Sequence, residues 1–265
     1  MAKKPIKRNT KVNPTTKTIK VEKIIEDKIE SKTEEITKLV INNIDKKNNI
    51  EETFDISHIL NNDTTWQMSI DERIIADYII QNLKVKDIAI EIGSLKGGFT
   101  NILAKNFKKV ISCDLDHKQI DKNRFNNVEW VTGNTRKTLA ELIEDINDKE
   151  DKVSFIFVDG DHTYDGVMSD IEDILLLKPK TTVVVLFHDT WYKSVRLAIC
   201  ESEIKNNKYV YYVNTDLCSV SSVVCKTMWG GLGIMIMKPD ERDFELSINQ
   251  SNDLMYLELF KSNNR

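Results

Sequence analysis

Long apolar runs are missing from this sequence, and no stretch approaches the ~20 residues of a membrane-spanning helix. The basic N-terminal residues are followed by no apolar segment, so we expect no secretory signal and no membrane partner. The 4 cysteines are scattered without a C-x-x-C pair, which argues against a zinc site and a disulfide framework. Together these absences predict a protein of a reducing, cytoplasmic compartment.

Two common nucleotide-binding motifs are also missing from residues 88–100 (IAIEIGSLKGGFT), the most informative stretch of the chain. A dinucleotide site needs G-x-G-x-x-G, so that pyrophosphate can sit on the N-terminus of the following helix. The glycines here are Gly93, Gly97 and Gly98, a spacing that does not fit. The Gly-Lys-Ser/Thr of a Walker loop is absent as well.

What residues 88–100 do contain is an apolar run that ends in Glu91 and Gly93, two further glycines, and a helical pattern from Phe99. This order predicts a buried strand that turns sharply into a helix. Glycines allow positive φ and the close approach of a ligand, and the helix N-terminus offers free N–H groups. Open α/β sheets bind their ligands at such carboxyl ends of strands.

Charge is divided unevenly along the chain. Residues 1–50 hold 13 Lys and Arg against 7 Asp and Glu, a balance of +6, whereas the remainder holds 25 against 35, a balance of −10. The acidic body will not attract nucleic acid through its overall field. Only residues 1–20, with 7 basic and no acidic side chains, could do so; we expect them to form a disordered, solubilising tail.

The next segments are predicted to be helical. Apolar residues recur at helical spacing over 21–44, and residues up to 50 form a linker; this amphipathic helix could pack on the body or mediate a homo-oligomer or a larger assembly through residues 1–50. Residues 51–85 are predicted to form a helical cap. In it, Ser69 caps a helix whose expected buried face is Ile70, Ile74, Ile75, Tyr78 and Ile79.

From residue 86 to 240 strands and helices alternate, and residues 241–265 form a polar C-terminal tail. Seven strands with helices between most of them predict a doubly wound α/β sheet that is mostly parallel, with the final pair antiparallel. The expected strands are 87–92, 109–114, 127–132, 153–159, 181–188, 208–213 and 232–238. The expected helices are 98–106, 117–124, 135–148, 164–178 and 193–206.

Polar residues stand at the carboxyl ends of the first three strands. Asp114 ends the second strand, 23 residues after Glu91, where a carboxylate can accept hydrogen bonds from both hydroxyls of a ribose. After the third strand, Gly133, Asn134 and Thr135 could frame an adenine edge.

Acidic and histidine side chains end the fourth and fifth strands. Because these strands should be neighbours, the side chains should converge in one crevice; they are Asp159, Asp161, His162, His188 and Asp189. Carboxylates suit Mg²⁺, and a mixture with histidine also suits Fe²⁺ or Mn²⁺. A lone aspartate at a strand end is often only a helix cap, but two clusters on neighbouring strands favour a functional site.

These motifs together resemble a known family. The pattern E-x-G-x-x-x-G-G-x-T is similar to motif I of class I S-adenosylmethionine (SAM) methyltransferases, and the segments FIFVDGDHTYDGVMSDI and LFHDTW resemble methyltransferase family 24 and the cation-dependent O-methyltransferases of the catechol and caffeoyl-CoA type. The resemblance covers residues 85–238. It implies a Rossmann-like methyltransferase fold and SAM as cofactor.

The resemblance also implies roles for single residues. Mg²⁺ or another divalent cation would bind Asp159 and Asp189, with Thr190 where those enzymes carry an asparagine ligand and Asp161 or His188 as substitutes. The catalytic lysine of the catechol type has no match, so His162, then His188, are the candidate bases. The candidate cofactor residues are Glu91, Gly93, Ser94, Gly97, Gly98, Asp114, Leu115, Gly133, Asn134 and Asp159.

Three functions stay open at this point. The first is a metal-dependent O-methyltransferase acting on a small molecule or a sugar, with Trp66, Trp191, Tyr192 and Trp229 as candidates for an aromatic acceptor pocket. The second is a structural or interaction protein on a methyltransferase fold, held in an assembly by residues 1–50. The third is a nucleic-acid methyltransferase, disfavoured by the acidic body and by the absence of an N/D-P-P-Y/F motif.

Overall fold

The computed structural model describes residues 59, 67–219, 222–224 and 226–249, all within the unit Ile56–Arg265. The predicted tail over 1–20, the predicted helix over 21–44 and its linker lie outside these residues, as do Trp66 and residues 250–265. Within the described part, no helix is both long and apolar enough to cross a membrane.

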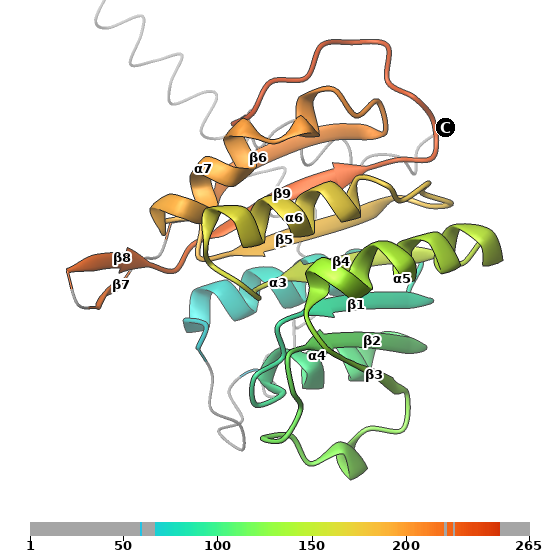
Figure 1. Cartoon of the computed structure of the whole chain (residues 1–265), viewed down its shortest axis with the longest axis vertical. Helices are drawn as coiled ribbons and strands as arrows, with labels where there is room; N and C mark the ends of the chain where they lie inside the picture. The colour runs from blue at the N-terminus through green and yellow to red at the C-terminus, as the bar shows by residue number, and fades with distance from the viewer. Residues whose placement is uncertain (1–58, 60–66, 220–221, 225, 250–265) are drawn as a thin grey trace, which may run out of the picture. The chain divides into compact units, whose positions relative to one another are not determined.

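A seven-stranded sheet forms the centre of this unit (Figure 1). Its strand order is β3-β2-β1-β4-β5-β9-β6, and only β9 runs antiparallel to its neighbours. The predicted doubly wound, mostly parallel sheet with an antiparallel final pair is confirmed. The strands are β1 (Ile88–Ile92), β2 (Lys109–Asp114), β3 (Val128–Thr132), β4 (Val153–Val158), β5 (Val183–His188), β6 (Val210–Cys218) and β9 (Leu232–Met237).

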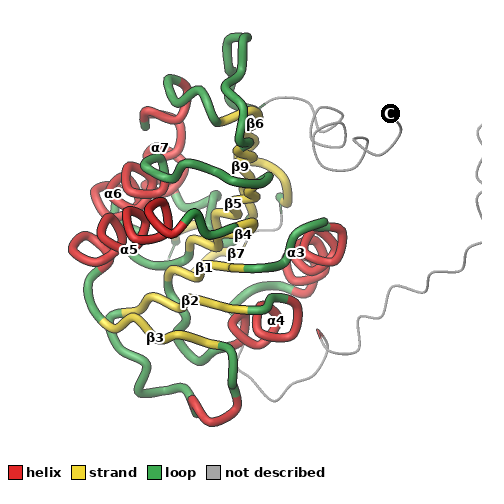
Figure 2. The backbone as a smooth tube through the Cα atoms, turned by 90° about the vertical axis from the view of Figure 1, so that its right-hand side faces the viewer, coloured by secondary structure: helices red, strands yellow, loops and turns green. Residues whose placement is uncertain are grey.

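Helices cover the sheet on both faces, so its central strands are apolar throughout. Every residue of β1, β4, β5 and β9 is buried. Figure 2 shows α5, α6 and α7 on one face and α3 and α4 on the other. The helices are α3 (Ile70–Asn82), α4 (Gly98–Asn106), α5 (Thr135–Lys149), α6 (Tyr164–Ile174) and α7 (Lys193–Glu201).

Two segments differ from the prediction. The expected helix over 117–124 is wrong: only a 3₁₀ turn forms, at Lys122–Arg124. Asp116 and Asp121 each accept a hydrogen bond from the backbone N–H two residues ahead, and such local bonds compete with a helix. The residues between the last two expected strands, 214–231, extend β6 and then form a hairpin of β7 (Ser222–Val224) with β8 (Thr227–Trp229).

The buried face of α3 also differs from the prediction. The Ser69 cap is present as a reciprocal capping box with Glu72. However, Ile70 and Tyr78 are exposed, while Glu72 and Arg73 are buried beside Ala76, Ile79 and Ile80. Arg73 donates to the carbonyls of Ser69 and Ile59, so its polar atoms have partners inside the protein.

The start of the predicted C-terminal tail packs on the sheet domain. Leu246 is buried with the main core, and the side chain of Asn249 accepts hydrogen bonds from the N–H and the hydroxyl of Thr215. Residues 241–249 are therefore part of this domain rather than a free tail.

The carboxyl ends of β1 and β4 touch each other closely. The N–H of Asp159 donates to the carbonyl of Ile92 at 2.8 Å. Gly93, at φ +86°, lies so close that a Cβ atom there would sit 2.1 Å from the carbonyl oxygen of Asp159. Gly97 has a similar φ of +76°, but a Cβ there would meet only the side chain of Ile120, at 3.4 Å.

These two glycines make a matched pair of mutations. Gly97→Ala should lower the free energy of unfolding by about 1–2 kcal/mol, the cost of a left-handed alanine. Gly93→Ala should cost more, since overpacking against backbone adds about 1–3 kcal/mol. Denaturant unfolding of both variants measures the difference. Equal losses of unfolding free energy would contradict the close approach of Gly93 to the backbone of Asp159.

Candidate functional site

A cavity of about 550 Å³ opens at the carboxyl ends of β1, β2 and β4. This is where β1 lies between β2 and β4, the point at which doubly wound sheets bind ligands. All the predicted cofactor residues line the cavity except Gly97. Gln67 and Met68, which precede α3, line it too, so the predicted cap region contributes to this site.

Asp114 braces the loop that follows β1. One carboxylate oxygen accepts hydrogen bonds from the N–H of Ser94 at 2.8 Å, the N–H of Leu95 at 3.0 Å and the hydroxyl of Ser94 at 3.1 Å. The other oxygen accepts from the N–H of Asp116. A carboxylate has room for about four hydrogen bonds, so Asp114 already holds the loop and keeps limited capacity for a ribose.

Glu91 lies at the floor of the cavity and is completely buried. One carboxyl oxygen accepts from the hydroxyls of Thr100 at 2.6 Å and Ser112 at 2.9 Å, while the other has no hydrogen-bond partner among the described residues. Burial raises the pKa of Glu91 to about 8, so the carboxyl is protonated at neutral pH.

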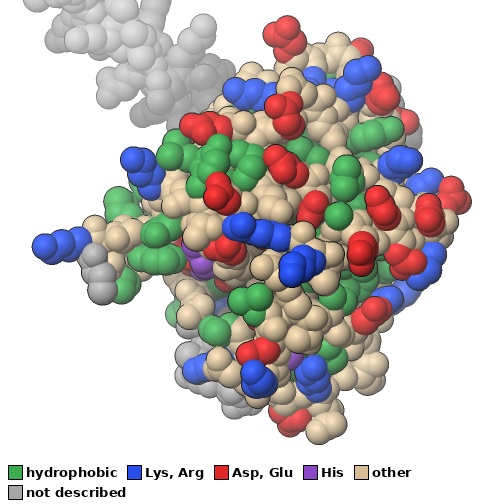
Figure 3. Space-filling view, in the orientation of Figure 1, with side chains coloured by type: hydrophobic (Ala, Val, Ile, Leu, Met, Phe, Trp, Pro, Cys, Tyr) green, Lys and Arg blue, Asp and Glu red, His purple; other side chains and the backbone are tan. Residues whose placement is uncertain are grey.

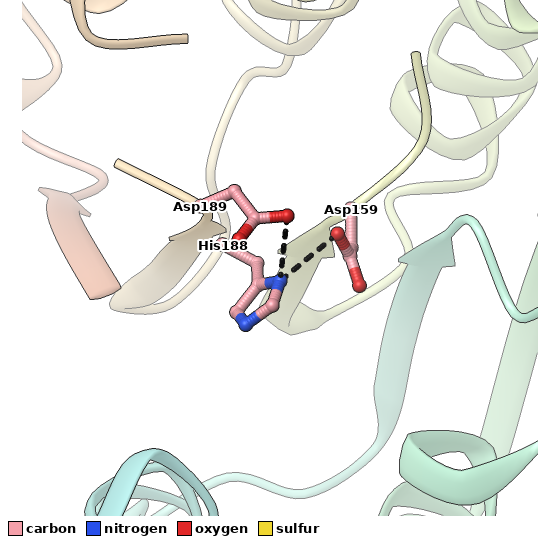
Figure 4. Close-up of side chains that lie close together, drawn as sticks. All are labelled: Asp159, His188 and Asp189. Carbon is pink, nitrogen blue, oxygen red and sulfur yellow. Dashed lines mark hydrogen bonds and ion pairs between the residues drawn. The ribbon is translucent and has the colours of Figure 1, made fainter. Parts of the chain in front are cut away.

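Beside this cavity, side chains from the ends of β4 and β5 form a compact cluster, which we call the His–Asp cluster: Asp159, His162, His188 and Asp189. His188 Nδ1 lies 3.1 Å from Asp159 Oδ1 and 3.4 Å from Asp189 Oδ2 (Figure 4). His162 Nε2 lies 2.9 Å from Asp189 Oδ2 and 3.3 Å from Asp159 Oδ1. Each histidine therefore bridges the same two carboxylates.

The histidines act as counter-ions for the carboxylates. Burial disfavours the charged form of His162, but contacts with Asp159 and Asp189 outweigh it and raise its pKa to about 9. The pKa of His188 is raised well above its usual value against the same opposing effect of burial. Burial would raise the pKa of Asp189, yet the two histidines lower it. His162 is therefore protonated at pH 7, and it can act as a base only after the carboxylates gain a different counter-charge and its ring loses that proton.

Asp189 has an unusual backbone conformation. Its φ is +54°, in the left-handed region that a non-glycine residue rarely occupies. Neighbouring groups hold it there: Gly230 N–H donates to its carboxylate and Tyr192 N–H to its carbonyl. Strained residues of this kind are concentrated at functional sites.

Two of the predicted metal residues behave differently from each other. Asp161 stays outside the cluster, because its carboxylate accepts from the N–H of Thr163 and pairs with Arg136. Thr190 is fully buried beside Asp189, and its hydroxyl has no hydrogen-bond partner among the described residues.

Of the aromatic residues proposed for an acceptor pocket, Tyr192 and Trp229 lie beside the His–Asp cluster and Trp191 does not. Tyr192 and Trp229 stack with centroids 4.3 Å apart, and Trp229 contacts the ring of His162 edge-on at 5.3 Å. Trp191 instead packs under the guanidinium of Arg196. Trp229 reaches the cluster from the β7–β8 hairpin, which projects at the left of Figure 3 with hydrophobic side chains on it. Its exposed apolar residues include Val223, Val224 and Met228.

Sequence reasoning missed Glu72, which contacts His188 from α3. Its only sequence signal, a glutamate three residues after Ser69, indicated a helix cap. It also missed the turn at Gly230 and Gly231, which connects the hairpin to Asp189.

The sheet order, the single antiparallel strand near its edge and the loop after β1 together define a class I methyltransferase fold. Residues 90–190 match the family model described as a methyltransferase domain, family 24. Over this segment the chain is therefore similar to that methyltransferase family, in agreement with the resemblance that its motifs indicated.

No curated protein matches the chain by sequence. Solved structures similar to it include a SAM-dependent O-methyltransferase from Thermotoga maritima (14% identity, TM-score 0.45, covering 71% of this chain and 72% of that chain). An rRNA methylase from Streptococcus thermophilus (15%, 0.43, 64% and 96%) and a precorrin 8W decarboxylase from Methanobacterium thermoautotrophicum (15%, 0.45, 67% and 94%) are also similar. These proteins are named for three different activities, so the likeness does not identify the reaction.

The raised pKa of Glu91 predicts a pH-dependent stability. Since its folded pKa is about 8 and its ordinary value is 4.5, the folded state binds the extra proton between these values. Stability should therefore fall as pH rises from 4.5 to 8. Glu91→Gln should remove this fall, so that the variant melts higher than the wild type at pH 8 but not at pH 4.5. The prediction would be contradicted if the difference in melting temperature between Glu91→Gln and the wild type were the same at pH 4.5 and pH 8.

Proposed function

We propose that the protein is a divalent-cation-dependent O-methyltransferase that transfers the methyl group of SAM to a hydroxyl of a small molecule or sugar. The observation that carries this proposal is the His–Asp cluster, which adjoins the SAM cavity through Asp159 and His162. A methyl acceptor bound there would face the cofactor. A cytoplasmic location stays a prediction; the described cysteines, Cys113, Cys200 and Cys218, are free thiols.

The cavity suits the charges of SAM. SAM has no phosphate, and its ammonium and sulfonium groups are cationic, so carboxyl groups at the cavity favour it. Glu91 offers an unpaired buried oxygen, and Asp114 lies at the end of β2 where the ribose is expected. An incoming ammonium would favour the ionised form of Glu91.

The residues of the cluster fit a divalent cation. Asp159, His188 and Asp189 each offer a ligand atom, and these atoms lie within 4.8 Å of one another. Thr190 follows Asp189 directly, and its hydroxyl has no hydrogen-bond partner among the described residues. Mixed oxygen and nitrogen donors suit Mn²⁺ or Fe²⁺ as well as Mg²⁺. A cation held there would neutralise the carboxylates and lower the pKa of a bound acceptor hydroxyl.

The protein's own groups supply the rest of the chemistry. His162 lines the cavity and is the candidate that takes the acceptor proton once the carboxylates are otherwise neutralised. The acceptor oxygen then attacks the SAM methyl carbon, and S-adenosylhomocysteine leaves. Holding both reactants in line supplies much of the rate enhancement. Tyr192 and Trp229 give the acceptor an apolar wall beside His162.

The two other functions predict different results in a methyl-transfer assay. An interaction protein on this fold would fail to turn over SAM with any acceptor. A nucleic-acid methyltransferase would transfer the methyl group to RNA or DNA rather than to small hydroxyl compounds. A screen of both acceptor types with radiolabelled SAM separates these functions from the one proposed.

Asp114→Ala should weaken SAM binding. The lost charge-assisted hydrogen bonds are worth about 1.5–3 kcal/mol each, so one lost bond corresponds to roughly 10–100-fold in affinity. Calorimetry measures this. Asp116→Ala is the matched control and should leave SAM binding unchanged, because this exposed aspartate lies two residues from Asp114 but does not line the cavity. Binding of NADH in preference to SAM would contradict the cofactor assignment.

Asp189→Asn should abolish most methyl transfer while the fold persists. Asparagine tolerates the left-handed φ of this position and can still accept from Gly230, but it removes the negative charge. We expect a loss of about 100-fold or more, the size seen when one positioned electrostatic group is removed. Asp145→Asn, on the exposed surface of α5 and away from the cavity, should have little effect. Activity is measured as S-adenosylhomocysteine formed from a panel of phenols, catechols and sugars.

The same assay tests the cation. Exhaustive EDTA treatment should abolish turnover, and added Mg²⁺ or Mn²⁺ should restore it. Full activity in EDTA would contradict the cation site and leave the two histidines as the only counter-ions of Asp159 and Asp189.

A further inference from the structure

We propose that Glu72 is a positioning residue of this site: it fixes the ring of His188 from the side opposite Asp159 and Asp189. The proposal rests on the function proposed above for the His–Asp cluster, although its main test does not require activity. It makes α3 part of the active site rather than only a cover.

Glu72 lies in the first turn of α3, and both of its carboxylate oxygens have partners inside the protein. Oε2 accepts a hydrogen bond from the N–H of Ser69 at 2.6 Å, which closes the capping box. Oε1 accepts from the N–H of Gly231 at 2.6 Å and lies 3.5 Å from Nε2 of His188.

A capping role alone does not account for this placement. A glutamate that only caps a helix can keep its carboxylate in water, as the exposed Asp71 beside it does. The side chain of Glu72 is only 2% exposed. Burial disfavours its charged form, yet the contacts with His188 and Ser69 outweigh this effect and lower its pKa. A buried carboxylate of this kind needs buried donors or a cation. The N–H groups of Ser69 and Gly231 are its donors, and His188, 3.5 Å away, is a cationic neighbour.

The two ring nitrogens of His188 face different groups. Nδ1 faces Asp159 and Asp189, where a cation would bind, whereas Nε2 faces Glu72 and has no hydrogen-bond partner among the described residues. A histidine that ligates a metal through one nitrogen usually donates the other N–H to a carboxylate, which sets its tautomer and orientation. Glu72 is placed for that role, and it would keep the proton on Nε2 and leave Nδ1 to face the site.

Glu72 also ties this ring to the turn before β9. Gly231 N–H binds Glu72, and the adjacent Gly230 N–H binds the carboxylate of Asp189. The same turn follows Trp229, which contacts His162. A Cβ atom at Gly231 would lie 2.5 Å from Trp191, so this turn has little freedom to shift. One carboxylate therefore positions the ring of His188 and the turn that supports Asp189.

The test is NMR of the full-length, ¹⁵N-labelled protein after removal of cations. The chain has only 4 histidines, so the ring nitrogens of His188 can be assigned from the signals lost in His188→Gln. Glu72→Gln keeps the length and removes the charge, and Glu72→Asp keeps the charge but is too short to reach His188. Both should shift the Nε2 signal of His188, because each variant changes the group that faces this nitrogen. Ser69→Ala, which removes the other half of the capping box, should lower the melting temperature and leave the ring signals unchanged.

A second measurement is the affinity for Mn²⁺, which is monitored through the paramagnetic signal of the free ion. Both Glu72 variants should bind it 10–100-fold more weakly than the wild type, and Ser69→Ala should not. Ring signals of His188 that stay unchanged in the folded Glu72 variants would overturn the proposal. Failure of the cation site itself would be seen separately, as a wild-type protein that binds no Mn²⁺.

Discussion

The contact between the carboxyl ends of β1 and β4 is the constraint on which the site depends. Gly93 has no side chain, and this alone lets the backbone of Asp159 pass at such short range. The loop after β1, which faces the cofactor cavity, and the His–Asp cluster therefore share one backbone wall. Because the wall is made of main-chain atoms in a buried sheet, the distance between cofactor and cluster does not depend on flexible side chains.

Charge balance is the second constraint. Asp159, Asp189 and Glu72 meet His162 and His188 in a region largely removed from water, where an unpaired charge is costly. The two imidazolium rings balance Asp159 and Asp189, and the charge of Glu72 also acts on the neighbouring Arg73. A cation bound at the cluster would take over the role of the histidine protons. SAM brings positive charge to the adjoining cavity, and a divalent cation would bring more. The electrostatics that hold the free protein together thus also favour the ligands of the proposed reaction.

The sequence predicted the sheet and which strand ends surround the cavity, because these parts are continuous in the chain. Residues 88–100 contain strand, turn and helix start, and Asp114 follows at the end of the next strand. It did not predict the contact of Glu72 with His188 or that of Gly230 with Asp189, since each joins segments far apart in the sequence. A glutamate three residues after a serine is a complete helix-cap signal, so nothing local indicated a second partner. The helix predicted over 117–124 was wrong because Asp116 and Asp121 form local turns.

The two halves of the site are built in different ways, and this bears on how such an enzyme can change substrate. The cofactor half comes from consecutive strand ends of one sheet, which cannot move independently. The half that we propose for the acceptor comes from α3, the loop after β5 and the β7–β8 hairpin, which meet at Gly230 and Gly231. The hairpin carries Trp229 to His162 but contributes no strand to the main sheet. Substitutions in the hairpin can therefore reshape the acceptor side while the strand ends that hold the cofactor stay in place.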